Sequence, residues 1–147
     1  MSPEIREILP PDTALAWPAM AALRTAWSDE SAFVARVDEV QRPAGYRLAG
    51  AFAGGPGEPA AAVAGFRIQH GLAWGHYLYV DDLSTLPEAR GQGHAGALLD
   101  WLLAEARARG CDEIHLDSGV QAERWDAHRL YLNHGYAITS HHFARPA

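Results

Sequence analysis

Cysteine and long apolar runs are almost absent from this chain. Cys111 is the only cysteine, which excludes an intrachain disulfide and suits a reducing compartment. We interpret Cys111 as a small apolar residue at the start of a strand. No segment approaches the roughly 20 consecutive apolar residues of a membrane span, and the first residues lack the basic-then-apolar pattern of a signal peptide. The sequence therefore predicts a soluble, cytoplasmic protein that has no membrane partner.

Positive charge is also scarce. The 147 residues include 12 lysines and arginines against 18 aspartates and glutamates, which gives a formal net charge of −6 at pH 7. Nucleic-acid binding needs a basic footprint, so this balance argues against such a partner. It favours a cationic or small neutral partner instead. The length and the 48% of hydrophobic residues fit a single domain, residues 1–147, with its own core.

Eight histidines raise the question of a metal centre. Potential ligands are His115-x-Asp117, His128, His134 and His141-His142. None of these has the tight spacing of a known zinc motif. Two of them fall on predicted strands, whose alternation would separate them. We therefore expect no metal, and interpret His115 and His128 as hydrogen-bonded residues.

Apolar periodicity divides the chain into helices and strands. The strands are predicted at Glu4–Leu9, Tyr46–Ala53, Ala60–Gln69, His76–Thr85 and Glu113–Ser118, with one or two more in Tyr136–Arg145. The helices are predicted at Thr13–Thr25, with an irregularity at Pro18, and at Asp29–Gln41, Gly93–Ala108 and Ala122–His134. The order β-α-α-β-β-β-α-β-α-β predicts an α/β fold: one mixed, mostly antiparallel sheet of about six to seven strands, flanked by four helices.

The most informative segment is the glycine-rich turn Arg90-Gly91-Gln92-Gly93-His94-Ala95-Gly96, which leads from a strand directly into a helix. Glycines allow the backbone to approach a ligand closely and to adopt dihedral angles that a Cβ forbids. The first turn of a helix has unpaired N–H groups and a partial positive charge. Together these features predict a site for a phosphate or pyrophosphate, and hence a phosphorylated cofactor.

Two interpretations of this turn are possible. Gly91-x-Gly93-x-x-Gly96 fits the dinucleotide fingerprint G-x-G-x-x-G, and Asp117 follows about twenty residues later, where that fingerprint has an acid. The context is wrong, however, because a dinucleotide fold places the turn after its first strand and adds several βα units after it. Here about ninety residues precede the turn.

A better match begins one residue earlier. Arg90-Gly91-Gln92-Gly93-His94-Ala95 resembles the R/Q-x-x-G-x-G/A signature of the GCN5-related N-acetyltransferase (GNAT) superfamily. Leu83–Ala89 resembles the approach to that loop, with its proline. The segment from Ala127 to Tyr136 resembles the family's A-x-x-x-Y-x-x-x-G-[FY] helix. The predicted order of elements also matches from end to end, so the resemblance spans the whole chain.

The resemblance implies acetyl transfer from acetyl-CoA to an amine and assigns the cofactor contacts. The amides of Gln92 to Gly96 would hold the pyrophosphate, with Arg90 at its entrance. In the family a bulge splays the strand before this loop, which frees backbone groups for the pantetheine arm and the thioester. The cofactor-binding residues implied in this way are Leu83, Ser84, Thr85, Arg90, Gly91, Gln92, Gly93, His94, Ala95 and Gly96.

The same resemblance suggests the catalytic groups. Tyr131 matches the position that often protonates the leaving thiolate. The amine must lose a proton before it attacks, and Asp81 and Asp82 are the expected bases. Tyr79-Val80-Asp81-Asp82-Leu83 resembles the Y-L-E-D-F stretch of the diamine acetyltransferase branch, with Asp81 in place of a glutamate. Regular alternation would place Tyr79, Asp81 and Leu83 on one face of the strand and Asp82 on the other.

One position departs from the family pattern. Many relatives have an asparagine two residues before the position of Ala127, where this chain has Trp125. A pantetheine contact from that asparagine therefore does not carry over. Cys111 lies outside the motifs, so we expect direct attack in a ternary complex and no acetyl-enzyme.

The acceptor is the least defined part of this interpretation. We expect it to meet Trp27, Asp29, Glu30 and Asp81, with Trp74 and Trp125 as further possible walls of its pocket. The acids Asp29, Glu30, Asp38 and Glu39 favour a small cationic amine, either polyamine-like or aminoglycoside-like. Alternatives are a peptide or protein amine, and a catalytically silent module that senses acyl-CoA. The family's dimers suggest a homodimer.

Overall fold

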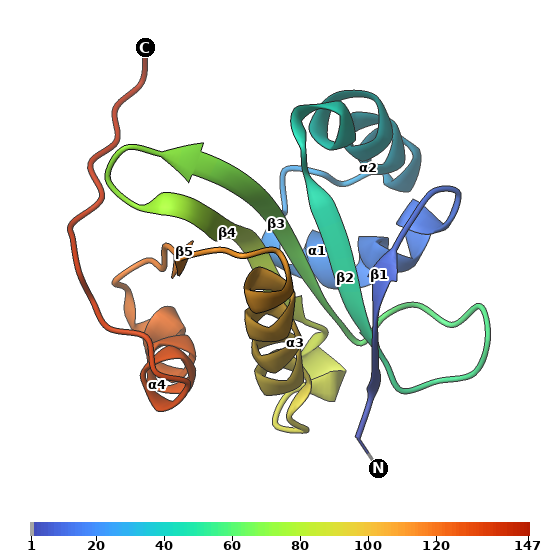
Figure 1. The fold of residues 1–147 in the computed structure, drawn as a ribbon. Coiled ribbons are helices and arrows are strands. Elements are labelled where there is room, and N and C mark those ends of the chain that lie inside the picture. The colour runs from blue at the N-terminus through green and yellow to red at the C-terminus, as the bar shows by residue number, and fades with distance from the viewer. Residues whose placement is uncertain (1) are drawn as a thin grey trace. The chain divides into compact units, whose positions relative to one another are not determined.

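Five strands form the sheet in the described part of this protein (Figure 1). The computed structural model describes residues 2–147. The strands are β1 (Glu4–Ile8), β2 (Arg47–Phe52), β3 (Ala62–Gly71), β4 (Gly75–Thr85) and β5 (Glu113–Leu116), and they lie in that order across the sheet. β1 to β4 pair antiparallel. β4 and its neighbour β5 are joined through a helix, the kind of crossover that parallel neighbours require.

The chain forms two units, Met1–His115 and Leu116–Ala147. The first contains α1 (Trp17–Leu23), α2 (Glu30–Arg36) and α3 (His94–Ala108), and the second contains α4 (Trp125–Asn133). The predicted helix Thr13–Thr25 is divided into a 3-10 turn, Asp12–Ala16, and α1. Pro18 explains the division, because proline lacks an N–H and is tolerated in the first turn of an α-helix. α2 likewise passes into a π-helical turn, Val37–Gln41.

α1 and α2 cover one face of the sheet. Their buried side chains pack with alternate residues of β1, β2 and β3 in one apolar cluster: Ile8, Ala16, Ala19, Met20, Phe33, Val37, Tyr46, Leu48, Phe52, Ala60 and Val63. Each of these residues is at most 7% exposed. The α2 side of the cluster includes Phe33, whose ring lies 5.4 Å from that of Trp17.

α3 covers the opposite face. Leu98, Leu99, Leu102 and Ala106 are buried, as the i, i+3, i+4 spacing predicts. The ring of Phe66 in β3 meets Trp101 of α3 edge-on at 5.9 Å. Because Val63 and Phe66 are three residues apart in one strand, they point to opposite faces. The sheet therefore carries helices on both faces, as expected.

The second unit corrects the sequence prediction. Tyr136–Arg145 was expected to add one or two strands, but residues 137–147 form no regular structure. Ile138 and Phe143 are 81% and 91% exposed. The run Thr139–His142 between them is polar and has no apolar alternation that could be buried against a sheet. Within residues 2–147 the sheet has five strands instead of six to seven.

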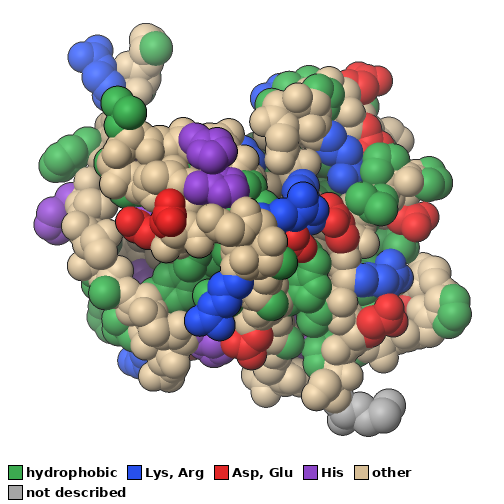
Figure 2. All heavy atoms as spheres, in the orientation of Figure 1, with side chains coloured by type: hydrophobic (Ala, Val, Ile, Leu, Met, Phe, Trp, Pro, Cys, Tyr) green, Lys and Arg blue, Asp and Glu red, His purple; other side chains and the backbone are tan. Residues whose placement is uncertain are grey.

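The distribution of surface charge and the length of the helices are relevant to possible partners. Arginine and acidic side chains are interspersed on the face drawn in Figure 2, and neither sign forms a broad patch there. In the described part of the chain, no helix is both long and apolar enough to cross a membrane.

Candidate active site

The glycine-rich loop lies between the end of β4 and α3. After Thr85 a 3-10 turn, Pro87–Ala89, leads into the loop, and α3 begins at His94. Gly91 and Gly93 have φ angles of +76° and +85°, which side chains with a Cβ rarely adopt. A Cβ built on either glycine would meet no atom within 4 Å. The loop therefore borders open space at the point where the first amides of a 15-residue helix are unpaired.

One backbone hydrogen bond and one side-chain contact are formed within this loop and the start of α3. The Gly93 carbonyl accepts from the Ala97 amide at 3.0 Å, which starts the helix. His94 is buried, and its Nε2 lies 3.3 Å from Oε1 of Gln92. Arg90 is exposed at the entrance to the loop. The arrangement offers backbone N–H groups and the positive end of a helix to an anion.

β4 contains a β-bulge next to this loop. Its pairing with β3 is regular from Gly75 to Val80 and again from Asp82 to Thr85, but the register shifts between Gly65 and Phe66 of β3. Asp81 is the extra residue. A bulge bends the strand and re-aims its side chains. The strand therefore changes direction at the residue expected to act as a base.

The bulge also changes which side chains share a face. Regular alternation predicted Leu83 beside Tyr79 and Asp81, with Asp82 on the opposite face; that prediction is wrong. Asp82 pairs with Gly65, two residues from the partner of Tyr79, so Asp82 and Tyr79 share one face. Leu83 lies on the other. The extra residue at Asp81 shifts the alternation by one position.

Beyond the bulge, the backbone groups of successive β4 residues point alternately toward β3 and away from it. The Leu86 amide donates to the Ala61 carbonyl at 2.8 Å, and the register is unbroken from there to Leu83. Hydrogen-bonded and non-bonded pairs alternate along an antiparallel ladder. The backbone groups of Ser84, like those of Leu86, therefore point toward β3. The N–H and C=O groups of Leu83 and Thr85 point away from β3.

On that side, β4 extends past its neighbour. The Asp112 amide donates to the His76 carbonyl at 2.6 Å, where β5 joins β4. β5 has four residues and ends at Leu116, whereas Leu83 lies seven residues beyond His76. β5 is therefore too short to pair with the backbone groups of Leu83 and Thr85.

Asp81 is held by two arginines. Its carboxylate accepts two hydrogen bonds from Arg67, from Nε and Nη2, both 2.8 Å long. Its backbone carbonyl accepts from Nη2 of Arg24 at 2.9 Å. The Arg67 guanidinium in turn lies 5.4 Å from the centre of the Tyr79 ring. These contacts fix the bulge residue through both its side chain and its backbone.

Asp82 has two partners of its own. It accepts from Nε of Arg24 at 2.7 Å and from the Tyr46 hydroxyl at 2.7 Å. Burial, followed by the charge of Asp82, raises the pKa of Tyr46 well above its ordinary value, so the phenol remains a donor. A Cβ on Gly65 would collide with the Tyr46 hydroxyl and ring. Glycine is therefore required there for Tyr46 to cross the strand and reach Asp82.

An aromatic group lies beside this cluster, on β4, β5 and the turn between β3 and β4. The rings of Trp74 and His115 are stacked at 3.6 Å, with 11° between their planes. Trp74 is also parallel to Tyr79, at 6.4 Å, and meets Tyr77 edge-on at 5.1 Å. The sequence suggested Trp74 as a possible wall of the acceptor pocket. In the structure, Trp74 neighbours Tyr79, and the Tyr79 ring lies next to Arg67, which binds Asp81.

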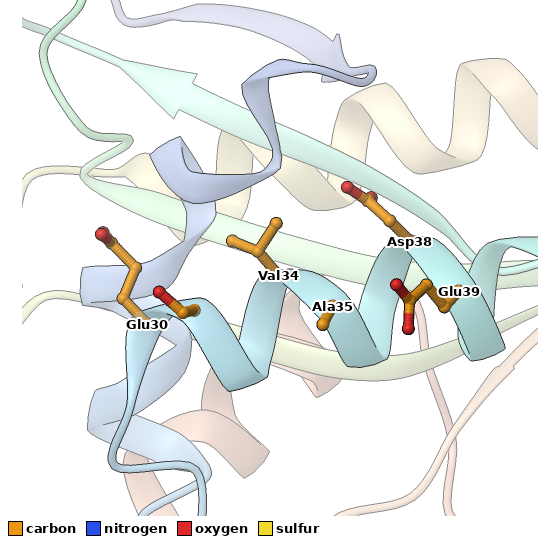
Figure 3. A pocket seen from close by; sticks show the side chains of 6 residues that line it. Glu30, Val34, Ala35, Asp38 and Glu39 are labelled. Atoms are coloured by element: carbon orange, nitrogen blue, oxygen red, sulfur yellow. The ribbon is translucent and has the colours of Figure 1, made fainter.

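The structure gives other partners to several of the predicted acceptor residues. Asp29 is the N-cap of α2, where its Oδ2 accepts from the Ala32 amide at 3.1 Å. The Arg36 guanidinium lies over the indole of Trp27, 5.6 Å from the centre of that ring. Glu30 belongs to a shallow acidic depression that runs along α2 (Figure 3). That depression is lined by α2 and the turn after it: Glu30, Ser31, Val34, Ala35, Asp38 and Glu39.

Tyr131 belongs to α4 of the second unit. It is buried, and its ring lies 6.2 Å from that of Tyr136. Burial raises the pKa of Tyr131, while the charge and hydrogen bond of Arg124 act in the opposite direction. Trp125, which stands where relatives have asparagine, donates from its indole to the Val120 carbonyl at 3.3 Å.

The histidines have local partners. His115 lies 2.8 Å from Glu113, and His128 lies 2.7 Å from the Gly119 carbonyl. Across residues 2–147, histidine, cysteine and acidic side chains form no group of three or more that could hold a metal ion.

Sequence reasoning missed the residues that hold the acidic pair, namely Arg24, Arg67 and Tyr46. Arg24 lies 58 positions from Asp82 along the chain and Tyr46 lies 36 positions from it. One feature of the sequence could have pointed to them. Arg67 is a charged residue within the apolar strand Ala62–Gly71, and a partly buried charge needs a partner on the same face of the sheet.

The fold and the loop together define a class of protein. A sheet with a bulge, followed by a glycine-rich turn at a helix N-terminus, is the arrangement that the resemblance to the acetyltransferases implies. Residues 3–136 match the Acetyltransferase (GNAT) family. The chain therefore belongs to this family, which confirms the resemblance seen in the sequence.

Individual relatives differ in what they act on. An aminoalkylphosphonate N-acetyltransferase of Salmonella typhimurium is 36% identical over 66 residues, which is 45% of this chain and 42% of that enzyme. The aminoglycoside N-acetyltransferase AAC(6')-Iy, solved in complex with CoA, matches with a TM-score of 0.78 at 18% identity, over 98% of this chain and 93% of the other. A ribosomal-protein-alanine N-acetyltransferase of Brucella melitensis biovar Abortus matches all of both chains, with a TM-score of 0.78 at 19% identity. These two structures are similar to this chain in fold.

Proposed function

We propose that this protein is an N-acetyltransferase that uses acetyl-CoA to acetylate the primary amine of a small molecule. The observation that carries the proposal is the pair of left-handed glycines, Gly91 and Gly93. They border open space at the N-terminus of α3, where a side chain would occupy the place of a diphosphate. The amides from Gln92 to Gly96 would hold that diphosphate, and Arg90 would stand at its entrance.

The end of β4 fits the rest of the cofactor. The backbone groups of Leu83 and Thr85 point away from β3 and lie beyond the end of β5, so they can pair with the amides of a pantetheine arm. An N–H from this segment would also stabilise negative charge on a carbonyl oxygen under attack. When bound, acetyl-CoA supplies an acyl group activated as a thioester. Ser84 lies between these two residues and completes the segment.

On the acceptor side, the chemistry requires that the amine lose a proton. Asp81 and Asp82 are the acids that the bulge places on the face bordered by Tyr79. The Asp81 carboxylate is engaged by Arg67 along one edge, which leaves lone pairs for a water or an amine. We propose that Asp81 accepts the amine proton, directly or through a water, and that Asp82 and Arg24 fix its position.

Departure of the thiolate is helped by a proton donor. Tyr131 is proposed for this role. Burial raises its pKa, so its hydroxyl keeps its proton at neutral pH and can donate it. The amine attacks the thioester carbonyl directly, and the C–S bond breaks as Tyr131 donates its proton to the leaving thiolate, so no covalent enzyme intermediate forms.

The acceptor proposed from the sequence is polyamine-like or aminoglycoside-like. The names of the relatives add aminoalkylphosphonates to the amines worth testing. A peptide amine is the alternative, since one structure with the same fold acts on a ribosomal protein. All twelve basic residues of this chain are arginines, so it offers no lysine side chain as a competing acceptor.

The proposal is tested by measuring CoA release from acetyl-CoA across a panel of small amines and short peptides. Calorimetry with CoA is run in parallel on the parent protein and on Gly93→Glu. We expect micromolar binding that Gly93→Glu abolishes, and release that depends on an added amine. Binding without amine-stimulated release would favour an acyl-CoA sensor. Absence of heat with CoA, with Gly93→Glu behaving like the parent, would remove the proposal altogether.

Tyr131→Phe separates chemistry from binding. Loss of a general acid typically lowers turnover by about 10²-fold or more, while the affinity for CoA should stay the same. Unchanged turnover would exclude Tyr131 from the reaction.

A further inference from the structure

We propose that the acceptor carries an acidic group beside its amine, a phosphonate or a carboxylate, and that Arg24 and Arg67 bind this group. The inference rests on the proposed function and defines its substrate class. It is drawn from the way in which the two guanidinium groups are used at the β4 bulge.

Both arginines bind the protein through the same edge. Arg67 uses Nε and Nη2 for the Asp81 carboxylate. Arg24 uses Nε for Asp82 and Nη2 for the Asp81 carbonyl. A guanidinium has five N–H donors in a planar fork. The outer edge of each arginine, formed by Nη1 and the second N–H of Nη2, therefore remains available to a ligand. Within residues 2–147, Nη1 of either arginine has no hydrogen-bond partner. The two side chains are 47% and 33% exposed.

An outer guanidinium edge is matched to a planar or tetrahedral oxyanion. Two parallel N–H···O bonds to a carboxylate or phosphonate add geometric specificity as well as charge. The Tyr79 ring beneath Arg67 and the Asp81 carboxylate beside it hold the plane of that guanidinium. The site is thus preorganised, and binding an acid costs little additional ordering.

Charge balance favours a zwitterion over a polycation. At the bulge two arginines face two aspartates, so an acceptor with one positive and one negative group leaves neither sign in excess. A polyamine would bring a second ammonium group next to the arginines, where like charges repel. Two of the acids expected to attract a polycation also have other roles. Asp29 caps α2, and Asp38 accepts from Arg42 and Thr13.

The position of the arginines gives the acid a mechanistic role. Both contact Asp81, the proposed base, through its carboxylate and its carbonyl. An acid bound to their outer edges would hold the amine of the same molecule close to that carboxylate. Orientation of this kind raises turnover as well as affinity.

The test uses three matched sets of acceptors: aminoalkylphosphonates, aminoalkyl carboxylates of the same chain length, and unsubstituted alkylamines of that length. CoA release gives kcat/KM for each, on the parent protein and on Arg24→Gln and Arg67→Lys. Arg6→Gln is the control, since Arg6 lies on β1, where it pairs with the exposed Glu4 and lies over the Phe52 ring. Calorimetry with the aminoalkyl acids measures their binding independently of turnover.

We expect the parent to prefer acid-bearing amines to plain amines by at least tenfold. Arg24→Gln and Arg67→Lys should reduce this ratio by about tenfold, the effect of one charged hydrogen-bonded contact, whereas Arg6→Gln should not change it. Comparison of the phosphonate and carboxylate sets then identifies which acid the site takes. Equal rates with plain amines and acids would overturn the inference while the acetyltransferase assignment stands. If no amine releases CoA, calorimetry provides the test. The inference is then also overturned if aminoalkyl acids bind Arg24→Gln and Arg67→Lys as tightly as they bind the parent protein.

Discussion

The sheet carries an arginine–carboxylate cluster on each face, and the two are built differently. On the α3 face, Arg47 binds Glu7 through two hydrogen bonds of 2.8 and 2.9 Å. Its Nη2 also lies 3.5 Å from Glu105 of α3, and its side chain is only 19% exposed. On the α1 face, Arg24 and Arg67 each bind one aspartate and are more exposed.

The difference follows from what covers each cluster. Arg47 lies 4.9 Å from the centre of the Phe66 ring and has carboxylates from both a strand and a helix, so it joins α3 to the sheet. The arginines of the bulge have carboxylates from β4 alone. We infer that the first cluster contributes mainly to stability and the second mainly to ligand binding, although both use the same chemistry.

The largest effect on stability should come from Arg47→Met. It leaves the mostly buried Glu7 without its partner and Glu105 with Arg109 alone, which costs about 3 kcal/mol and lowers the melting temperature by roughly 10 °C. The affinity for acetyl-CoA should not change. Arg67→Met should have the opposite profile, with a small effect on melting and a large one on acceptor turnover. Similar melting losses in the two variants would contradict the division between the clusters.

Gly65→Ala should disturb the packing of the bulge cluster on the α1 face. The new methyl group would meet the hydroxyl and ring of Tyr46, and overpacking of this kind costs about 1–3 kcal/mol. As Tyr46 leaves Asp82, kcat/KM for the amine should fall with it. Gly55→Ala serves as the control, because that turn has open space and an ordinary φ. If the crystal structure of Gly65→Ala retained the Tyr46–Asp82 bond, this account of the glycine would be wrong.

These two regions also differ in how far the sequence could predict them. The positions of the glycine-rich turn and of α3 were predicted correctly because their determinants are local: glycines that can adopt positive φ, then an apolar helical period. The bulge at Asp81 arises from pairing with β3, and its arginines come from 14 and 57 positions away, so no local pattern contains them. The C-terminal strands were wrong because pairing, not propensity, decides whether Tyr136–Arg145 joins a sheet.

Asp81→Asn and Asp82→Asn should separate a base from a positioning residue. Asp81→Asn removes the group proposed to accept the proton and should lower kcat/KM for the amine by at least tenfold. Asp82→Asn keeps a hydrogen-bond acceptor for Tyr46 and should lower it less. Neither should alter acetyl-CoA binding, and Asp12→Asn, an exposed acid on a 3-10 turn, should change nothing. A larger loss in Asp82→Asn would exchange the two roles.

The smallest effect expected is the pH dependence of the Arg47–Glu7 pair on the α3 face. The hydrogen bond from Arg47 lowers the pKa of Glu7 below its ordinary value of 4.5, against a smaller opposing effect of burial. A lowered pKa contributes stability that is present above pH 4.5 and is lost as the pH falls through the folded value. Glu7→Gln should therefore cost about 1 kcal/mol at pH 7, and the gap between variant and parent should narrow below pH 4.5. Glu4→Gln, at the exposed Arg6 pair, should show almost no gap at either pH. A gap for Glu7→Gln that is the same at pH 3 and pH 7 would mean that packing, and not charge, joins Arg47 to β1.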